Sequence, residues 1–374
     1  GMAIVLTLGA TWGAYLLLKI GLKGSFAAVG IHEINAHGHA QIFGWVGLFV
    51  MGFAYQAFPR FKHTTLAHPR LALATLWMML VGIVCRSGSE AFLAGRPWLL
   101  PIGLAGSVLE VVAIGCFVGI ICTTLRGSGK PLAFYDSYIL SALAWFLVQA
   151  VYETLYFYGT ASAPDRSSLL ALVATWQAPL RDIQIHGFIL LMILGVSQRL
   201  FPNFYGFPAP NQRKSRISLY SLNAAVLGEA AGLVLLREAG RIWALLWYGA
   251  VLVLAFSTLV LVLDWRIYSK PEETDRSLKF LRTAYVWLLI SLGMLVAYPV
   301  YQFVLLPVLA PESGAAQIGF SHAYYGGIRH AITVGFISLM IVGVAAKVAP
   351  TLKGIDLRGL KSLWVPYVLI NVGC

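Results

Sequence analysis

Four of the eight histidines in this chain fall near the start of apolar segments that end in proline: His37, His39, His186 and His330. His39 and His330 each lie twenty residues before the proline of their segment. An imidazole buried in lipid without a partner is costly, so histidines at one depth indicate a function. Neutral imidazole is a common metal ligand. We therefore predict that these four histidines bind metal.

The residues that follow these histidines favour haem iron over zinc. A glycine and an aromatic residue stand together at one register in the three segments, as Gly44–Trp45, Gly187–Phe188 and Gly335–Phe336. Glycine leaves the space that a flat macrocycle requires, although it also allows close helix packing, which remains the alternative. His37 and His39 lie about 200° apart around a regular helix, so they face two sites. We expect one or two haem b groups, or a haem with copper or another metal.

Three acidic residues also lie inside apolar segments, and we predict that they share the histidine layer. They are Glu110, Glu153 and Glu229. An intramembrane carboxylate indicates proton transfer, metal ligation or a buried structural partner. Glu153 and Glu229 are the candidate catalytic residues, either as proton donors or as metal ligands.

Two arginines and three further histidines have simpler predicted roles. Arg329, directly before one of the four histidines, and Arg181 are candidates to hold haem propionates, and each is equally suited to anchor a helix at the membrane interface. Three of the other four histidines, His32, His63 and His68, stand beside charged residues outside the apolar segments. We predict that all three are solvated.

Apolar helices must position these side chains, because 59% of the residues are hydrophobic and only 11% are charged. A soluble domain would need about a quarter of its residues charged. Ten apolar runs are long enough to span a bilayer: 3–22, 37–59, 71–92, 98–125, 136–158, 184–202, 217–236, 242–264, 282–309 and 327–349. An eleventh begins near Leu360. The sequence thus predicts an all-α, polytopic membrane bundle with about eleven helices in the 374 residues shown.

The three histidine-bearing segments indicate an internal repeat. Their final prolines are Pro59, Pro202 and Pro350, separated by 143 and 148 residues, which is the length of four membrane helices with their loops. We predict one transmembrane domain with three pseudo-repeats of four helices, at about 1–130, 131–275 and 276–374. Twelve helices would complete this plan, so we expect residues beyond the last one shown.

The net charge of +12 reflects membrane topology. Two thirds of the 27 lysine and arginine residues lie in five alternate loops, at 60–70, 126–130, 199–216, 266–282 and 347–361. The positive-inside rule places these loops and the N-terminus in the cytoplasm. The charges are scattered among short loops and form no basic patch, so we expect lipid contact and no nucleic-acid binding.

With histidines on the second, sixth and tenth helices, the chain resembles subunit I of haem-copper oxidases and nitric oxide reductases. The run HGHAQIFGW, from His37 to Trp45, is more similar to the NnrS branch. The resemblance implies a haem- and copper-containing protein of the bacterial inner membrane that is linked to nitric oxide stress. It also implies a quinol or cytochrome electron donor and partner subunits.

The oxidase pattern assigns roles to the histidines by resemblance. A histidine on the second helix and one on the tenth clamp a low-spin haem, which corresponds to His37 or His39 and to His330. The copper ligand of the sixth helix corresponds to His186. The pattern's adjacent histidine pair on the seventh helix is absent from 217–236, so a three-histidine copper site is not expected.

Two functions follow from these expectations. The first is a haem b protein in respiratory electron transfer or nitric oxide handling, with reduction of oxygen or nitric oxide as a candidate activity. The second is a non-catalytic di-haem cytochrome subunit of a larger complex. A transporter with a midplane site fits poorly, because the repeats are parallel and the ligands lie near one face.

Overall fold

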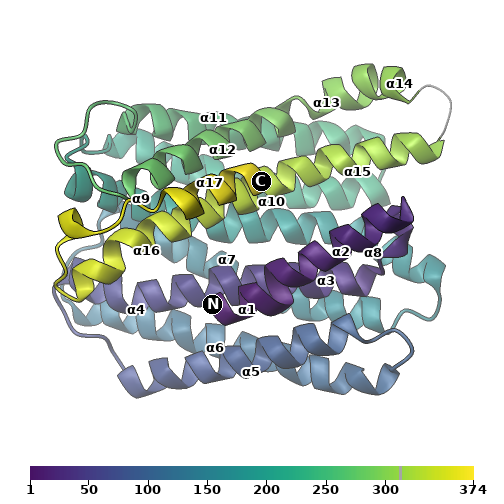
Figure 1. Ribbon diagram of the computed structural model, residues 1–374, viewed down its shortest axis with the longest axis horizontal. Helices are drawn as coiled ribbons and strands as arrows, with labels where there is room; N and C mark the ends of the chain where they lie inside the picture. The colour runs from purple at the N-terminus through teal and green to yellow at the C-terminus, as the bar shows by residue number, and fades with distance from the viewer. Residues whose placement is uncertain (311–313) are drawn as a thin grey trace. The chain divides into compact units, whose positions relative to one another are not determined.

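The structure is a computed structural model that describes residues 1–310 and 314–374 (Figure 1). Ten of its helical segments are long and apolar enough to cross a membrane, and each overlaps one of the ten predicted runs. The described residues contain no strand. The predicted all-α, multi-pass membrane architecture is therefore confirmed.

The chain divides into two compact units, of which unit 1 comprises Gly1–Ala133, Ile139–Leu190 and Leu233–Glu238. Its elements, in chain order, are α1 (Met2–Ile4), η1 (Val5–Gly9), α2 (Ala10–Lys23), η2 (Phe26–Ala28), α3 (Ile31–His39), η3 (Ala40–Gly47), α4 (Leu48–Lys62), α5 (Pro69–Ala91), η4 (Pro97–Leu99), α6 (Leu100–Gly127), most of α7 (Phe134–Ala161), α8 (Arg166–Asp182) and η5 (Ile183–Leu190). Helix α5 runs along α6 (Figure 1), and α3 packs against α5.

Two glycines bring α5 and α6 together. A Cβ atom on Gly106 would lie 2.7 Å from the carbonyl oxygen of Gly82 and 2.8 Å from the backbone nitrogen of Arg86. A Cβ atom on Gly82 would in turn lie 2.9 Å from the carbonyl oxygen of Gly106. Membrane helices associate through such small residues, because lipid supplies no hydrophobic force between helices.

Unit 2 comprises Phe134–Tyr138, Leu191–Gly232 and Ala239–Cys374. Its elements are α9 (Leu191–Tyr205), most of α10 (Gln212–Glu238), η6 (Arg241–Trp243), α11 (Ala244–Trp265), α12 (Leu278–Val296), α13 (Tyr298–Val300), η7 (Tyr301–Leu305), α14 (Leu306–Leu309), α15 (Gly314–His330), η8 (Ala331–Ser338), α16 (Leu339–Leu352), η9 (Leu357–Gly359) and α17 (Trp364–Gly373). Helix α12 packs against α11, η8 and α16. Tyr285 of α12 lies at the centre of an aromatic cluster, with ring centroids 5.5–5.9 Å from those of Phe201, Trp265 and Phe336.

Three π-helical segments of eight residues, η3, η5 and η8, mark the predicted repeats. Each begins nineteen residues before the final proline of its histidine-bearing segment. Single-turn π-bulges occur frequently at functional sites. Here His39 and His330 directly precede η3 and η8, and His186 lies within η5. The three histidine-bearing segments therefore share both their residue pattern and the position of a π-helical stretch.

The ninth predicted span is shorter in the structure than 282–309. Helix α12 ends at Val296, and three short helical pieces follow from Tyr298 to Leu309. Pro299 explains the break, because proline has no N–H and its ring collides with the carbonyl group four residues earlier. The sequence therefore stays apolar to Leu309, but the regular α-helix ends at Val296.

The sixth predicted span, 184–202, is longer in the structure. Elements α8, η5 and α9 form one helical segment, Arg166–Tyr205. The side chain of Asp165 caps its start by accepting a hydrogen bond of 2.8 Å from the backbone N–H of Ser168. The first half of this segment is too polar to be recognised by hydropathy alone.

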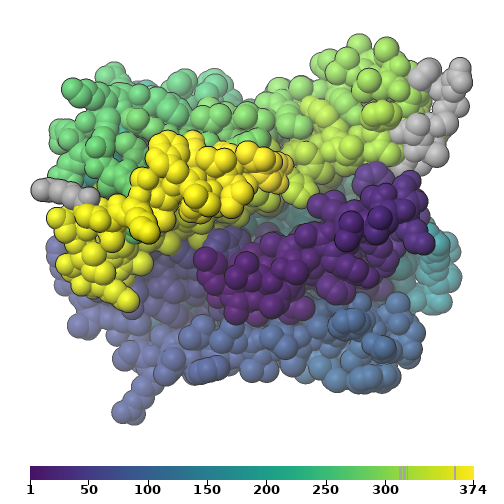
Figure 2. Space-filling model, viewed as in Figure 1, coloured from purple at the N-terminus to yellow at the C-terminus, as the bar shows by residue number. Residues whose placement is uncertain are grey.

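The first helical segment of unit 1 (purple in Figure 2) and the last of unit 2 (yellow in Figure 2) each carry exposed apolar side chains. Leu22 near the end of α2 is 77% exposed, and Val372 of α17 is 80% exposed. Large exposed apolar side chains of this kind are stable in lipid, so both segments support membrane contact.

Candidate functional site

Unit 1 encloses charged and polar side chains that come from α3, α5, α6, α7, α8 and η5. We call this cluster the polar core: His32, Asn35, His39, Arg86, Ser87, Glu90, Ser107, Glu110, Gln149, Glu153, Tyr156, Arg181 and Gln184. Five of its ionisable residues are at most 1% exposed, namely His39, Arg86, Glu90, Glu110 and Glu153. Ionisable residues are expensive inside a membrane and usually functional, so this is the candidate site.

His39 lies between two carboxylates. Its Nε2 atom is 3.0 Å from Oε1 of Glu110, and its Nδ1 atom is 3.7 Å from Oε1 of Glu153. The ring stacks on Phe43 with centroids 4.3 Å apart. The imidazole donates Nε2–H to the Glu110 carboxylate in this arrangement. The structure thus places two of the three predicted acids against a predicted histidine.

Glu153 is held by two further side chains. Its Oε2 atom accepts a 2.7 Å hydrogen bond from Gln184 Nε2 and lies 3.4 Å from Nη1 of Arg181. Arg181 also donates to Gln184 Oε1 at 2.7 Å. A Cβ atom on Gly38 would come within 3.3 Å of the Arg181 guanidinium, so the missing side chain allows this approach. Arg181 therefore pairs with a carboxylate of the protein itself.

Sequence reasoning missed Arg86 and Glu90, which form a fully buried ion pair one helical turn apart on α5. The Arg86 guanidinium also lies over the Phe157 ring, 3.6 Å from its centroid. Removing one partner of such a buried pair typically costs about 3–5 kcal/mol, because it leaves an uncompensated charge. An arginine and a glutamate at i, i+4 near the end of the apolar run 71–92 were the available signal.

One of the three histidines that we predicted to be solvated is partly buried. His32 Nδ1 lies 3.5 Å from Oε1 of Glu90, and the His32 side chain is only 19% exposed. The prediction was wrong there because the partner is distant in sequence. His63 and His68 are exposed, as expected.

His37 and His330 share one hydrogen-bonding pattern. His37 Nδ1 lies 3.0 Å from the carbonyl oxygen of Gly9, and His330 Nδ1 lies 2.9 Å from that of Gly326. With Nδ1–H donating to a carbonyl, each imidazole is the tautomer whose lone pair is on Nε2, as in metal-ligating histidines. The His37 ring fits closely against Gly13, where a Cβ atom would lie 2.5 Å from it.

The other predicted site residues are placed separately. His186 is buried within η5, and Glu229 is fully buried on α10 in unit 2. Arg329 donates to the hydroxyl group of Tyr325 and lies over its ring, 4.9 Å from the centroid. Across the described parts of the chain, no three His, Cys, Asp or Glu residues form a group placed to hold a metal ion. Metal ligation by the four histidines therefore stays a prediction.

Comparison with known families accounts for the whole chain. The family model described as NnrS protein matches residues 1–374. The chain belongs to the NnrS family. No curated protein matches it. The NnrS resemblance seen in the run from His37 to Trp45 is thereby confirmed, and it extends over both units.

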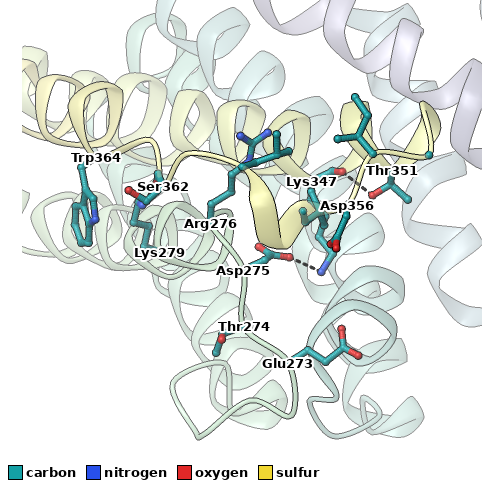
Figure 3. A pocket seen from close by; sticks show the side chains of 14 residues that line it. Glu273, Thr274, Asp275, Arg276, Lys279, Lys347, Thr351, Asp356, Ser362 and Trp364 are labelled. Carbon is teal, nitrogen blue, oxygen red and sulfur yellow. Dashed lines mark hydrogen bonds and ion pairs between the residues drawn. The ribbon is translucent and has the colours of Figure 1, made fainter.

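The NnrS chain also has a cavity of about 750 Å³ in unit 2, at the ends of α12 and α16 (Figure 3). Asp275 and Lys347 face each other inside it and form an ion pair of 2.6 Å. Arg276 donates to the carbonyl oxygen of Ala346 at 3.1 and 3.2 Å. None of the predicted site residues lines this cavity, and these basic groups are bonded to the protein itself.

The loop before α12 supplies Asp275, a titrating group of this cavity that lies outside the spans. Burial opposes ionisation of Asp275, but hydrogen bonds from Lys347 and Ser277 outweigh it and hold the pKa of the carboxyl group below its usual value. Asp275 is therefore ionised at neutral pH and forms an ion pair with Lys347. This ion pair stabilises the wall of the cavity.

Proposed function

We propose that this member of the NnrS family binds haem b within the membrane and acts in nitric oxide handling or respiratory electron transfer. The supporting observation is the shared geometry of His37 and His330. His37 lies three residues before η3 and His330 lies directly before η8, and each donates Nδ1–H to a backbone carbonyl. An imidazole with this tautomer suits axial ligation of haem iron.

Haem bound to these histidines would supply one-electron chemistry. The chain's part is to offer the Nε2 lone pairs, with the carbonyl groups of Gly9 and Gly326 fixing the orientation of the two rings. His186 is the candidate ligand for copper or another second metal. Arg329, half-buried beside His330, is the candidate partner of a haem propionate.

The polar core contributes acid–base groups to the same function. His39 holds a proton at Nε2 toward Glu110, while Arg181 and Gln184 orient the Glu153 carboxylate. These contacts favour His37 over His39 as the iron ligand, because both ring nitrogens of His39 face carboxylates. Glu153, and Glu229 in unit 2, are the candidate proton donors for a reductase activity.

The charge pattern of the loops supports an orientation with the N-terminus in the cytoplasm of a bacterial inner membrane. In that orientation the histidine layer is near the outer side. A quinol or a cytochrome, with further subunits, would then supply electrons. These partners follow from the resemblance to the oxidase group.

A reduced-minus-oxidised spectrum of the purified, full-length chain tests this proposal. We expect a haem b difference spectrum and a further change on addition of carbon monoxide, which requires an iron coordination position open to a ligand. A protein without any haem contradicts the proposal. Six-coordinate haem that does not react with carbon monoxide contradicts the reductase activity and leaves electron transfer as the function.

A further inference from the structure

Many buried polar atoms of the polar core lack a hydrogen-bond partner among the residues that the structure describes. They are His32 Nδ1, Asn35 Nδ2, His39 Nδ1, Arg86 Nε and Nη2, Ser87 Oγ, Glu90 Oε1, Ser107 Oγ, both amide atoms of Gln149, Glu153 Oε1 and Tyr156 Oη. Native proteins rarely leave buried polar groups unpaired, and a missing partner is commonly an ordered water molecule. Within a bilayer an unsatisfied group costs more, so the need for partners is stronger.

Several of these atoms lie near one another at distances just beyond those of direct hydrogen bonds. His32 Nδ1 is 3.5 Å from Glu90 Oε1, and Glu153 Oε1 is 3.6 Å from Arg86 Nη2 and 3.7 Å from His39 Nδ1. Good hydrogen bonds to oxygen are about 2.7–3.2 Å long, so these contacts are too long for direct bonds. A water molecule beside such a pair can bond to both atoms.

We propose that the polar core holds a file of bound water molecules that leads from His32 to Glu153 and carries protons into unit 1. His32 is the partly exposed end of the file, while Glu90, Arg86 and Glu153 are fully buried. His32 precedes His39 by seven residues on α3, which corresponds to about 10 Å of depth. Water and acidic side chains in such chains serve as proton relays in membrane proteins.

The charges that border the file select against other occupants. Arg86 and Arg181 lie beside the carboxylates of Glu90 and Glu153, so positive and negative charges alternate along the file and neither a metal cation nor an inorganic anion is favoured as a bound occupant. A neutral molecule with both donors and acceptors fits best. The unpartnered atoms themselves include both kinds, with donors on Arg86 and Asn35 and acceptors on Glu90 and Glu153. The water file requires no haem, so it can be tested apart from the haem binding proposed above, and its inner end, Glu153, is a candidate proton donor in that function.

Hydroxyl-radical footprinting of the wild-type chain in lipid nanodiscs tests the proposal, because radicals formed in bound water modify the side chains beside it. Tyr156 is 5% exposed, and its unpartnered hydroxyl lies close to Asn35. Tyr285 and Tyr138 are 0% exposed, and they donate their hydroxyl protons to Ser197 and to the backbone carbonyl of Ser215. We expect Tyr156 to be modified several-fold faster than both. Equal rates for the three tyrosines would overturn the proposal.

A variant then locates the water. Asn35→Leu replaces an amide whose Nδ2 atom is unpartnered, and we expect the modification rate of Tyr156 to fall to that of Tyr285. Asn223→Leu, on α10 in unit 2, is the matched control and should leave the Tyr156 rate unchanged. Slow modification of Tyr285 in the same sample shows that the variant is folded. A Tyr156 rate that Asn35→Leu does not alter would place the water elsewhere and refute the file.

Discussion

The partners of an ionisable residue decide what it can do, and these partners are what a single sequence hides. The histidines and acids of interest were recognisable because an ionisable side chain is conspicuous in an apolar run. Their contacts were not, because His39 meets Glu110 and Glu153 from two other helices. The same holds for His32, whose partner Glu90 lies 58 residues along the chain.

The Asp275–Lys347 pair provides a residue-scale prediction about acid stability. The pKa of Asp275 is lowered in the folded state, so its stabilisation is complete above the unfolded pKa and is lost as the pH falls through the folded pKa. We expect Asp275→Asn to destabilise the protein by about 1.5–3 kcal/mol at pH 7, the usual contribution of a hydrogen bond to a charged group. The difference from wild type should shrink below about pH 4.

Thermal unfolding in detergent, followed from pH 7 to pH 3, measures this difference. Glu273→Gln in the same loop is the control, because Glu273 is exposed and its substitution should change stability by less than about 0.5 kcal/mol. A difference between wild type and Asp275→Asn that stays constant down to pH 3 would show that the carboxylate is not the stabilising group.

At the scale of helices, composition predicted the existence of the spans and backbone chemistry set their limits. All ten predicted spans occur, because a run of about twenty apolar residues has few alternatives to crossing the bilayer. Pro299 nevertheless ends α12 before the apolar run ends, and the polar first half of Arg166–Tyr205 extends a span that hydropathy placed at 184–202. The π-helical segments have no hydropathy signal, since lengthening a turn does not change composition.

The contact between α5 and α6 gives an element-scale prediction. Gly106→Ala places a Cβ atom 2.7 Å from the carbonyl oxygen of Gly82, so the helices must separate. We expect a loss of about 1–3 kcal/mol in stability, the usual cost of overpacking. Gly115→Ala on the same helix is the matched control, because a Cβ atom there meets nothing within 4 Å.

Unfolding in a mixed detergent, compared for the two variants, measures this cost. The control should retain wild-type stability or gain slightly, because alanine favours a helix over glycine. Equal stability of Gly106→Ala and Gly115→Ala would mean that α5 and α6 do not depend on this close approach.

At the scale of the whole molecule, the repeat seen in the sequence and the compact units of the structure divide the chain differently. The predicted repeats end near 130 and 275, whereas one helical segment, Arg166–Tyr205, contributes residues to both units. The repeat is visible in sequence because the prolines and glycines recur in register. In the structure, π-helical segments recur at the same positions. The units depend on contacts between distant segments, which one sequence without homologues does not reveal.

Haem content of histidine variants tests the central claim most directly. His330→Ala and His37→Ala remove the two imidazoles with matched tautomers, while His68→Asn removes an exposed histidine at φ 50°, a conformation that asparagine tolerates. Each protein is purified as a folded, monodisperse sample, and its haem is quantified by extraction. The proposed function predicts loss of haem from the first two variants and a full complement in the third. A full haem complement in both His330→Ala and His37→Ala would contradict it.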